Sequence, residues 1–245
     1  MQLVRSLLFN LILWTSVLFY APLALLTFPF PFIVRYRFIC AWARFHMWLL
    51  RVLCGLRYRV QGREHLPQGA AIVLSKHQST WETLTFPEIF PVHAWLLKRE
   101  VLWIPLFGWA VALLNPIAID RGSGHRAIQQ LIEQGRERLS RGVWVLVFPE
   151  GTRTPPGSRR PWKVGGAVLA AETGYPVVPV AHNAGQFWRR RSFVKRPGTI
   201  DVVIGPAIET RGRKAEDIKR EAEAWVTRAM ERLEGAAATP VERRA

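Results

Sequence analysis

The part of the chain that follows residue 56 alternates short apolar runs with longer patterns of helical period. Apolar runs of strand length lie at residues 57–60, 70–75, 94–98, 116–119, 143–148, 177–181 and 199–204. Helices are predicted at residues 124–141, 163–173 and 214–233, where apolar positions recur every three to four residues. Strands that alternate with helices in this way favour a mainly parallel β-sheet flanked by helices, so the predicted fold class is α/β.

The beginning of the chain has a different pattern, a long apolar run in place of alternating strands and helices. Residues 6–34 carry no charge, and an uncharged apolar run of about 18 residues or more is a candidate membrane segment. Prolines interrupt the run from position 22 onward, so the predicted helix covers residues 3–20, roughly 27 Å at about 1.5 Å per residue. Such a helix either barely spans a bilayer or enters one leaflet. A secretory signal fits less well, because Arg5 alone precedes the run and no small-x-small cleavage site follows.

A second helix is predicted over residues 35–56. Arg37, Arg44 and Arg51 recur every seven residues and form one stripe along it. The predicted apolar arc opposite this stripe consists of Phe38, Trp42, Phe45, Leu49, Val52 and Leu56. A basic stripe with a wide aromatic face favours a helix that lies among lipid headgroups, and a buried helix with solvated arginines is the alternative.

These patterns divide the chain into three parts. Residues 1–56 form the expected membrane-associating helical segment, residues 57–235 the main domain, and residues 236–245, which are small or charged, a loose tail. More arginines follow the uncharged run than precede it, so the positive-inside rule places the main domain in the cytoplasm.

Charge is the strongest feature of the composition. The chain has 245 residues, with 34 Lys and Arg against 18 Asp and Glu, which gives a net charge of +16. This excess indicates an anionic partner: a membrane surface, a nucleic acid or phosphorylated substrates. A hydrophobic content of 49% excludes a disordered chain, and two cysteines exclude a disulfide framework. No phosphate loop, dinucleotide fingerprint, HExxH or GxSxG motif is present, and the scattered histidines predict no metal site.

The first candidate for chemistry follows the predicted strand at residues 70–75, in the segment SKHQSTWE. On a regular helix His77 and Glu82 would point about 140° apart, so they meet only if His77 precedes the helix and Glu82 lies in its first turn. Ser79-x-x-Glu82 has the form of a capping box, which predicts a helix start at this place. Two interpretations stay open: Glu82 orients His77 as a base, or Glu82 simply caps the helix.

The second candidate is the segment VLVFPEGTRTPPG, residues 145–157, in which a predicted strand ends at Phe148-Pro149. Gly151 permits close approach of a ligand to the backbone, and Thr152 and Arg153 are suited to bind phosphate oxygens. The alternative is a strand-ending turn with a solvent-exposed arginine.

Together, the strand-end His-x4-acid and the strand-end Pro-Glu-Gly-Thr-Arg resemble the glycerolipid acyltransferase family. Residues 98–121 and 177–183 fit the order and spacing of two further motifs of that family, and the resemblance covers about residues 56–206. The chain departs from the family pattern at Glu82, where the acid is usually Asp.

The resemblance implies transfer of a fatty acyl group from a thioester, acyl-coenzyme A or acyl carrier protein, to a glycerol hydroxyl, with no bound cofactor and no metal. His77 would be the general base and Glu82 its orienting acid. The implied substrate-binding residues are Lys98, Arg121, Glu150, Gly151, Thr152 and Arg153. The expected reaction converts 1-acylglycerol-3-phosphate to phosphatidic acid at the sn-2 hydroxyl. Another lysophospholipid or a lyso-ornithine lipid is the alternative acceptor.

The implied partners are an anionic membrane surface and acyl carrier protein, at the cytoplasmic face of a bacterial inner membrane. A basic cluster is predicted in a loop and consists of Arg189, Arg190, Arg191, Lys195 and Arg196. It suits anionic lipid, the 3′-phosphate of coenzyme A or solvent. Two other classes are disfavoured: a nucleic-acid-binding protein, because no recognition motif is present, and an inactive membrane scaffold, because both His77 and Glu82 are present.

Overall fold

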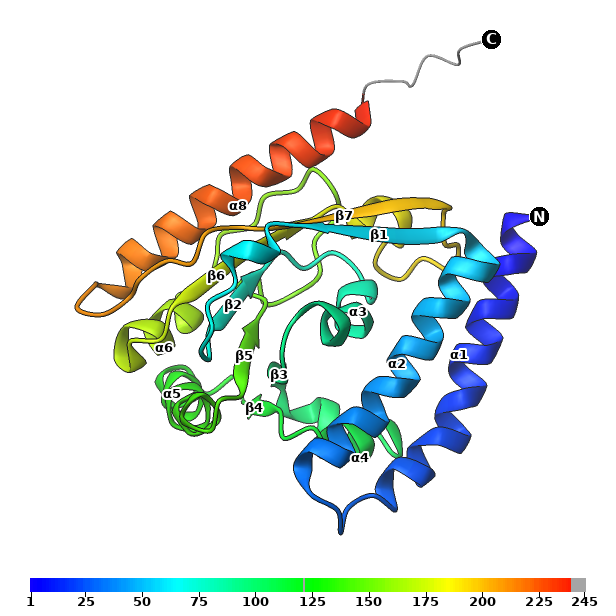
Figure 1. Ribbon diagram of the computed structural model, residues 1–245, viewed down its shortest axis with the longest axis horizontal. Helices are drawn as coiled ribbons and strands as arrows, with labels where there is room; N and C mark the ends of the chain where they lie inside the picture. Colours follow the sequence, from blue (N-terminus) through cyan, green and yellow to red (C-terminus); the bar gives the residue numbers. More distant parts are fainter. Residues whose placement is uncertain (121, 239–245) are drawn as a thin grey trace.

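The computed structural model describes residues 1–120 and 122–238 (Figure 1). The helices are α1 (Gln2–Leu25), α2 (Phe32–Cys54), α3 (Trp81–Ile89), α4 (Phe107–Ala112), α5 (His125–Ser140), α6 (Gly165–Thr173), α7 (Ala184–Phe187) and α8 (Ala215–Ala238), with short 3-10 helices η1 (Arg63–His65) and η2 (Arg99–Trp103). The strands are β1 (Leu56–Gln61), β2 (Ile72–Ser75), β3 (His93–Lys98), β4 (Ile117–Ile119), β5 (Trp144–Val147), β6 (Val177–His182) and β7 (Gly198–Ile204). Each predicted strand overlaps an observed one.

The strands form one seven-stranded sheet in the order β1-β7-β6-β2-β5-β3-β4. Strands β6, β2, β5, β3 and β4 run parallel to one another, and β7 is antiparallel to β6 and parallel to β1. The prediction of a mainly parallel sheet is confirmed. Because five parallel strands end at the same edge, the loops that follow β2, β5 and β6 lie together there.

Each face of the sheet is buried under helices (Figure 1). Alternate residues of a strand point to opposite faces, so Ile72 and Leu74 pack under α5, α6 and α8, whereas Val73 packs toward α2 and α3. The short strands β2, β5 and β6 are buried along their whole length, which explains why their sequences are continuous apolar runs.

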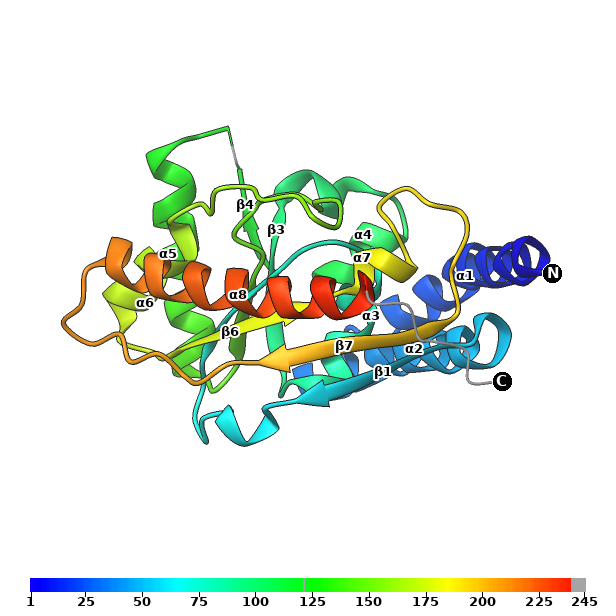
Figure 2. The ribbon, with the colours of Figure 1, turned by 90° about the horizontal axis from the view of Figure 1, so that it is seen from above.

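Helices α1 and α2 form an antiparallel pair beside the sheet (Figures 1 and 2). The same core includes Phe9 of α1, Leu50 of α2 and Val73 of β2, so packing is continuous across the expected boundary at residue 56, which stays a prediction. Helix α1 continues to Leu25, although the proline was expected to end it at residue 20. Ala21 and Ala24 pack on α4 and hold this last turn in place.

Helix α2 has apolar residues on two sides. Arg37, Arg44 and Arg51 are exposed as the predicted stripe, and Phe45 and Val52 of the predicted apolar arc are exposed as well. The buried face consists of Tyr36, Cys40, Ala43, His46, Met47, Leu49, Leu50 and Cys54. Whether the exposed apolar side lies among lipid headgroups stays a prediction.

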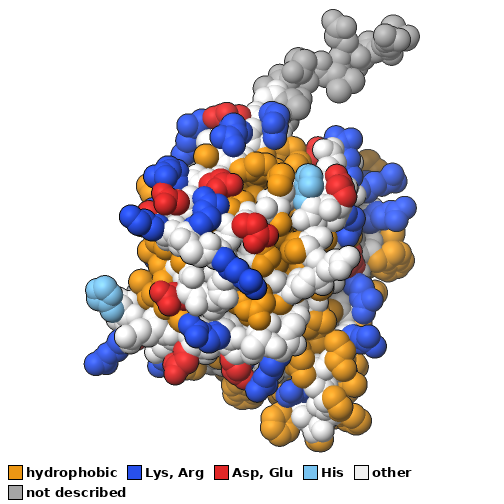
Figure 3. Space-filling model, turned by 60° about the vertical axis from the view of Figure 1, so that its left-hand side comes forward, with side chains coloured by type: hydrophobic (Ala, Val, Ile, Leu, Met, Phe, Trp, Pro, Cys, Tyr) orange, Lys and Arg blue, Asp and Glu red, His pale blue; other side chains and the backbone are white. Residues whose placement is uncertain are grey.

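The exposed apolar residues gather at one end of the molecule. Helix α1 is long and apolar enough to cross a membrane by length and composition. Its large exposed side chains are Leu3, Val4, Leu7, Leu8, Leu11, Trp14, Leu18, Phe19 and Leu23. In Figure 3, acidic and basic side chains are interspersed over much of the visible face, whereas hydrophobic ones gather at the lower end, where α1 and α2 are joined in Figure 1. This N-terminal apolar surface indicates membrane association.

Helix α8 is longer than expected. Helix α8 extends to Ala238, past the predicted start of the loose tail at residue 236. Alanine has the highest helix propensity, which explains why the Ala-rich end of the helix continues. Residues 239–245 lie outside the described residues.

A substitution in α2 tests whether this helix is part of the folded core. Leu50 is 1% exposed and Val52, on the same helix, is 58% exposed. Leu50→Ala should lower the free energy of unfolding by about 2–5 kcal/mol because it leaves a cavity. Val52→Ala should change it by about 0.5 kcal/mol at most. Denaturant unfolding of the full chain in detergent measures both, and equal small losses would show that α2 is not part of the core.

Candidate active site

The imidazole of His77 lies directly after β2 and faces a buried carboxylate. Its Nδ1 is 2.8 Å from Oε1 of Glu82, which is fully buried in the first turn of α3. The ring stacks on Phe148, with ring centroids 3.9 Å apart and an interplanar angle of 13°. Donation from Nδ1 to the carboxylate leaves Nε2 with its lone pair, which is the protonation state that a general base requires.

Glu82 also caps the helix. The backbone N–H groups of Gln78 and Ser79 donate to the same Oε1, at 2.8 and 2.7 Å, and the hydroxyl of Ser79 accepts a bond from the N–H of Trp81. The capping box and the contact with His77 therefore occur together, and the two interpretations of this segment do not exclude each other. One carboxylate oxygen performs both roles.

The surroundings of Glu82 keep it ionised. Burial alone would raise the pKa of its carboxyl, but the neighbouring His182 and His77 rings and the N–H of Ser79 outweigh burial and lower it. Among the described residues Oε2 has no hydrogen-bond partner, so the charge is stabilised mainly at Oε1. An ionised Glu82 can stabilise an imidazolium at His77.

A buried ion pair fixes the backbone of His77. The Nζ of Lys76 donates to Oε1 of Glu150, whereas Oε2 of Glu150 accepts from the N–H of His77 at 3.1 Å and from the hydroxyl of Thr154 at 3.2 Å. The N–H of Thr154 in turn donates to the carbonyl of His77. Glu150 was expected to hold the acceptor, but both of its oxygens are engaged within the protein. Its contacts are those of a residue that positions His77.

His182 is a second buried histidine that lies next to Glu82. It ends β6, is fully buried, and its Nε2 lies 4.0 Å from Oε1 of Glu82 and 2.8 Å from the carbonyl of Lys76. The N–H of Ala184 points at the other ring nitrogen, Nδ1. Burial lowers the pKa of His182, so the ring is neutral, with its proton on Nε2. This tautomer is opposite to that of His77.

The remaining residues of the second motif lie in the loop after β5. Gly151 has a φ of 70°, a conformation that favours glycine, and a Cβ there would lie 3.2 Å from the side chain of Lys163. Thr152 and Arg153 follow it and are half-buried. Burial lowers the pKa of Arg153, although the negative charge of Glu82 opposes this shift.

Lys98 makes no described contact with His77. Lys98 ends β3, beyond β5 in the sheet, and its half-exposed ammonium is paired with Glu100 at 2.6 Å. Arg121 lies outside the described residues, so its role stays a prediction.

The sequence reasoning missed the contacts of Lys76, Phe148 and Thr154. Each is a direct neighbour of a residue or motif that the sequence singled out, and this adjacency was the available signal. His182 lies within the motif at residues 177–183, and no role was predicted for it. Its contact with Glu82 joins β6 to α3 across 100 residues of the chain and has no local signature.

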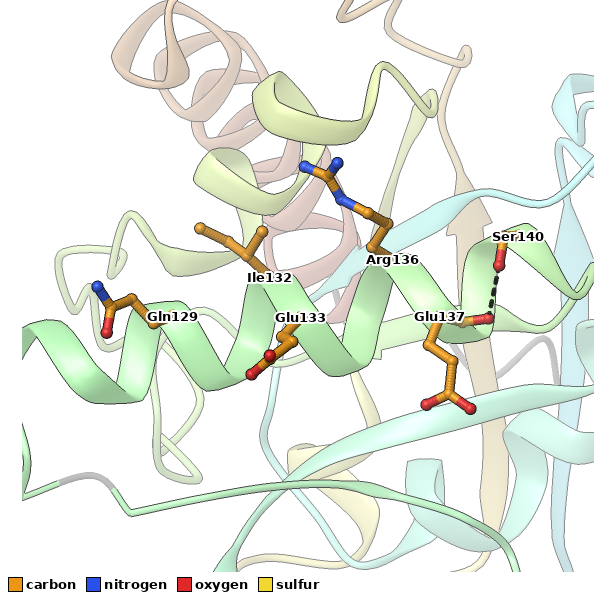
Figure 4. A pocket seen from close by; sticks show the side chains of 6 residues that line it. All are labelled: Gln129, Ile132, Glu133, Arg136, Glu137 and Ser140. Carbon is orange, nitrogen blue, oxygen red and sulfur yellow. Dashed lines mark hydrogen bonds between the residues drawn. The ribbon is translucent and has the colours of Figure 1, made fainter.

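A cavity of about 200 Å³ adjoins the site. It lies where β3, β4 and β5 end, and Phe148 and Gly151 are part of its wall. Lys163 contributes one polar side chain, and the other lining residues are apolar or glycine. A larger depression of about 730 Å³ covers the outer surface of α5 (Figure 4). Its lining residues all belong to this one helix and none of them comes from the strand ends that carry His77.

An imidazole paired with a buried carboxylate, at the carboxyl edge of a parallel sheet, is an arrangement typical of enzymes that activate a hydroxyl or water nucleophile. A family model described as Acyltransferase matches residues 57–183. The chain is 46% identical over 248 residues to the 1-acyl-sn-glycerol-3-phosphate acyltransferase of Pseudomonas aeruginosa, which covers 99% of this chain and 95% of that protein. This chain belongs to the acyltransferase family, so the resemblance inferred from its motifs is confirmed.

Less similar proteins support the same family assignment. The 1-acyl-sn-glycerol-3-phosphate acyltransferase alpha of Homo sapiens is 34% identical over 172 residues, which is 69% of this chain and 61% of that protein. The crystal structure of the 1-acyl-sn-glycerophosphate acyltransferase PlsC from Thermotoga maritima superposes with a TM-score of 0.78 at 24% identity and covers 98% of both chains. The fold is therefore shared over nearly all of the described residues, including α1 and α2.

Substitution of Glu82 tests its two roles separately. Glu82→Gln keeps an oxygen that accepts the backbone N–H groups but removes the charge that stabilises the imidazolium. It should lower kcat by about 100-fold or more, since loss of the orienting carboxylate costs about 10,000-fold in the serine-protease triad. Glu82→Asp keeps the charge and should retain more activity than Glu82→Gln. Steady-state kinetics of the purified variants measures both.

The pH dependence of the unfolding free energy shows whether the charge of Glu82 also stabilises the fold. Folding lowers the pKa of Glu82 from its usual 4.5, so its stabilisation is complete above that pH and is lost as the pH falls through the folded pKa. The advantage of the wild type over Glu82→Gln in unfolding free energy should therefore shrink in acid. Near-full activity in both the Gln and the Asp variant would leave Glu82 as a helix cap alone.

The contribution of the Lys76–Glu150 pair to the unfolding free energy can be measured separately. Both side chains are buried, so Lys76→Met should cost about 3–5 kcal/mol by leaving an unpaired carboxylate. The double variant Lys76→Met/Glu150→Gln should recover much of this loss. Chemical unfolding of the two single variants and the double variant measures the coupling, and strictly additive losses would mean that the pair does not form.

Proposed function

We propose that this protein transfers a fatty acyl group from an acyl thioester to the free sn-2 hydroxyl of 1-acylglycerol-3-phosphate, which yields phosphatidic acid. The observation that carries the proposal is the whole-chain identity of 46% to the 1-acyl-sn-glycerol-3-phosphate acyltransferase of Pseudomonas aeruginosa. The His77–Glu82 pair supplies the chemistry that such a reaction needs.

In the proposed mechanism, Nε2 of His77 removes the proton of the acceptor hydroxyl. The resulting alkoxide attacks the thioester carbonyl directly, the tetrahedral intermediate collapses, and the thiolate leaves. The proton on Nε2 then passes to the thiolate, so that His77 returns to its initial state. Glu82 holds Nδ1 and stabilises the transient imidazolium.

The acceptor phosphate is assigned to the loop after β5. Arg153 offers a guanidinium that makes no side-chain hydrogen bond or ion pair among the described residues, and Thr152 provides a hydroxyl beside it. Gly151, whose N–H donates to the carbonyl of Phe148, supplies the left-handed turn that precedes them. Arg121 is assigned to the same phosphate from the motif resemblance. The pairing of Lys98 with Glu100 makes Lys98 a weaker member of this set.

The acyl chain is assigned to the cavity beside Phe148, because its lining is almost entirely apolar. The donor is acyl-coenzyme A or acyl carrier protein, and the net charge of +16 favours an anionic donor and an anionic membrane surface. The exposed apolar face of α1 is assigned to the bacterial inner membrane, with the remainder of the chain on the cytoplasmic side.

The test uses the purified full-length protein in detergent with acyl-coenzyme A and a panel of lyso-acceptors. Release of free thiol and the mass of the product are recorded for 1-acylglycerol-3-phosphate, lysophospholipids and lyso-ornithine lipid. We expect phosphatidic acid to form fastest. A faster reaction with another lyso-lipid would reassign the acceptor.

The matched variant is His77→Ala. Removal of a general base costs a factor of about 100 to 10,000, so acceptor-dependent thiol release should fall by that amount while expression and membrane association stay unchanged. More than half of the wild-type rate in this variant would contradict the mechanism.

A further inference from the structure

The loop between α7 and β7, residues 188–197, joins the site to the first helix of the chain. In Figure 2 this loop extends from α7 toward α1 before it enters β7. It contains the basic cluster that the sequence left without a defined partner. The structure separates the members of that cluster: Lys195 is buried, whereas the four arginines remain exposed.

One end of the loop is fastened to α1 by Lys195. Its Nζ donates to Oδ1 of Asn10 and to the carbonyl of Phe193, and it lies 4.7 Å from the ring centre of Trp188. Its backbone N–H donates to the hydroxyl of Ser6 at 3.0 Å. Burial lowers the pKa of Lys195 to about 8, which keeps the side chain predominantly cationic at neutral pH. The loop therefore cannot move independently of α1 without breaking several buried bonds.

The other end of the loop reaches the phosphate side of the site. The Nη1 of Arg190 donates to the backbone carbonyl of Arg153 at 3.4 Å. No salt bridge is made by either arginine among the residues that the structure describes. After burial and the opposing effect of Glu82, the positive charge of Arg190 also lowers the pKa of Arg153. Two guanidiniums that make no salt bridge among the described residues thus belong to one contact, and the nearer of them, Arg153, also interacts with the charge of Glu82.

We propose that Arg190 binds the acceptor phosphate together with Arg153, and that Lys195 holds the loop of Arg190 in position against α1. This inference rests on the proposed function and adds a residue from outside the family motifs. A phosphate monoester carries a charge of about −1.5 to −2 near neutral pH, whereas a phosphodiester carries about −1. Two guanidiniums therefore favour 1-acylglycerol-3-phosphate over a lysophospholipid whose phosphate is esterified on both sides.

The placement also suits an acceptor that resides in a membrane. Phe193 lies in the same loop and is 45% exposed, and its carbonyl accepts a bond from Asn10 of α1. An apolar residue that enters the lipid layer beside α1 leaves Arg190 at the depth of the headgroups. The acceptor can then present its phosphate to Arg190 while its acyl chain stays in the leaflet.

The test compares Arg190→Ala with Arg189→Ala in the full-length enzyme. Both variants remove one exposed charge from the same loop, but Arg189 has no described contact with Arg153. Arg190→Ala should raise the KM for 1-acylglycerol-3-phosphate by about 10-fold or more, with kcat and the KM for acyl-coenzyme A nearly unchanged. Its preference for this acceptor over lysophosphatidylglycerol should fall by a similar factor. Arg189→Ala should stay within about 2-fold of the wild type in all these values.

A soluble probe separates phosphate binding from membrane binding. Glycerol 3-phosphate has the phosphate monoester but no acyl chain, so its inhibition constant should rise in Arg190→Ala and stay unchanged in Arg189→Ala. Equal behaviour of the two variants in an otherwise active enzyme would overturn the assignment of Arg190. A wild type that does not acylate 1-acylglycerol-3-phosphate would instead contradict the proposed function.

Lys195 is a positioning residue and needs a different readout. Lys195→Met keeps much of the side-chain length and removes the charge, and Asn10→Leu breaks the same contact from α1 if the first variant fails to fold. Either change should raise the KM for the acceptor. Combined with Arg190→Ala it should add little, because both act through one guanidinium. Fully multiplicative effects would show that Lys195 acts on stability and not on Arg190.

Discussion

The site depends on the compensation of one buried charge. Glu82 is fully buried, and a carboxylate in such a place is stable only when hydrogen bonds replace the water it has lost. Two backbone N–H groups and the imidazole of His77 converge on its Oε1. Because those N–H groups belong to the turn between β2 and α3, the charge that orients His77 also stabilises the turn that carries it. Catalytic geometry and local folding are therefore satisfied by the same atom.

The parallel sheet supplies the other constraints. Strands β2, β5 and β6 are neighbours, so the residues that follow them meet at one edge although they are far apart in the chain. Lys76 after β2 pairs with Glu150 after β5, and His182 at the end of β6 donates to the carbonyl of Lys76. The backbone of His77 is thus held from both sides. This arrangement limits the motion of the base before any substrate is bound.

Local features were predictable from the sequence and long-range ones were not. The strands and the gap between His77 and Glu82 follow from periodicity and helix geometry, because both depend on neighbouring residues. Neighbouring residues in the sequence could not decide whether Glu82 caps the helix or contacts His77. The structure shows that one carboxylate oxygen makes both sets of hydrogen bonds. The contact of Glu150 with Lys76 could not be predicted, because the two residues lie 74 positions apart in the chain. The buried face of α2 could not be told from its exposed apolar face, because its partners in α1 and the sheet had to be known first.

The protonation states of the two site histidines test this account most directly. In protein labelled with 15N in its histidine rings, the nitrogen chemical shifts at neutral pH report which nitrogen of each ring carries the proton. We expect His77 to be protonated on Nδ1 and unprotonated on Nε2, whereas buried His182 should have the opposite tautomer. A proton on Nε2 of neutral His77 would contradict the account, because that nitrogen would then have no lone pair with which to accept the proton of the hydroxyl.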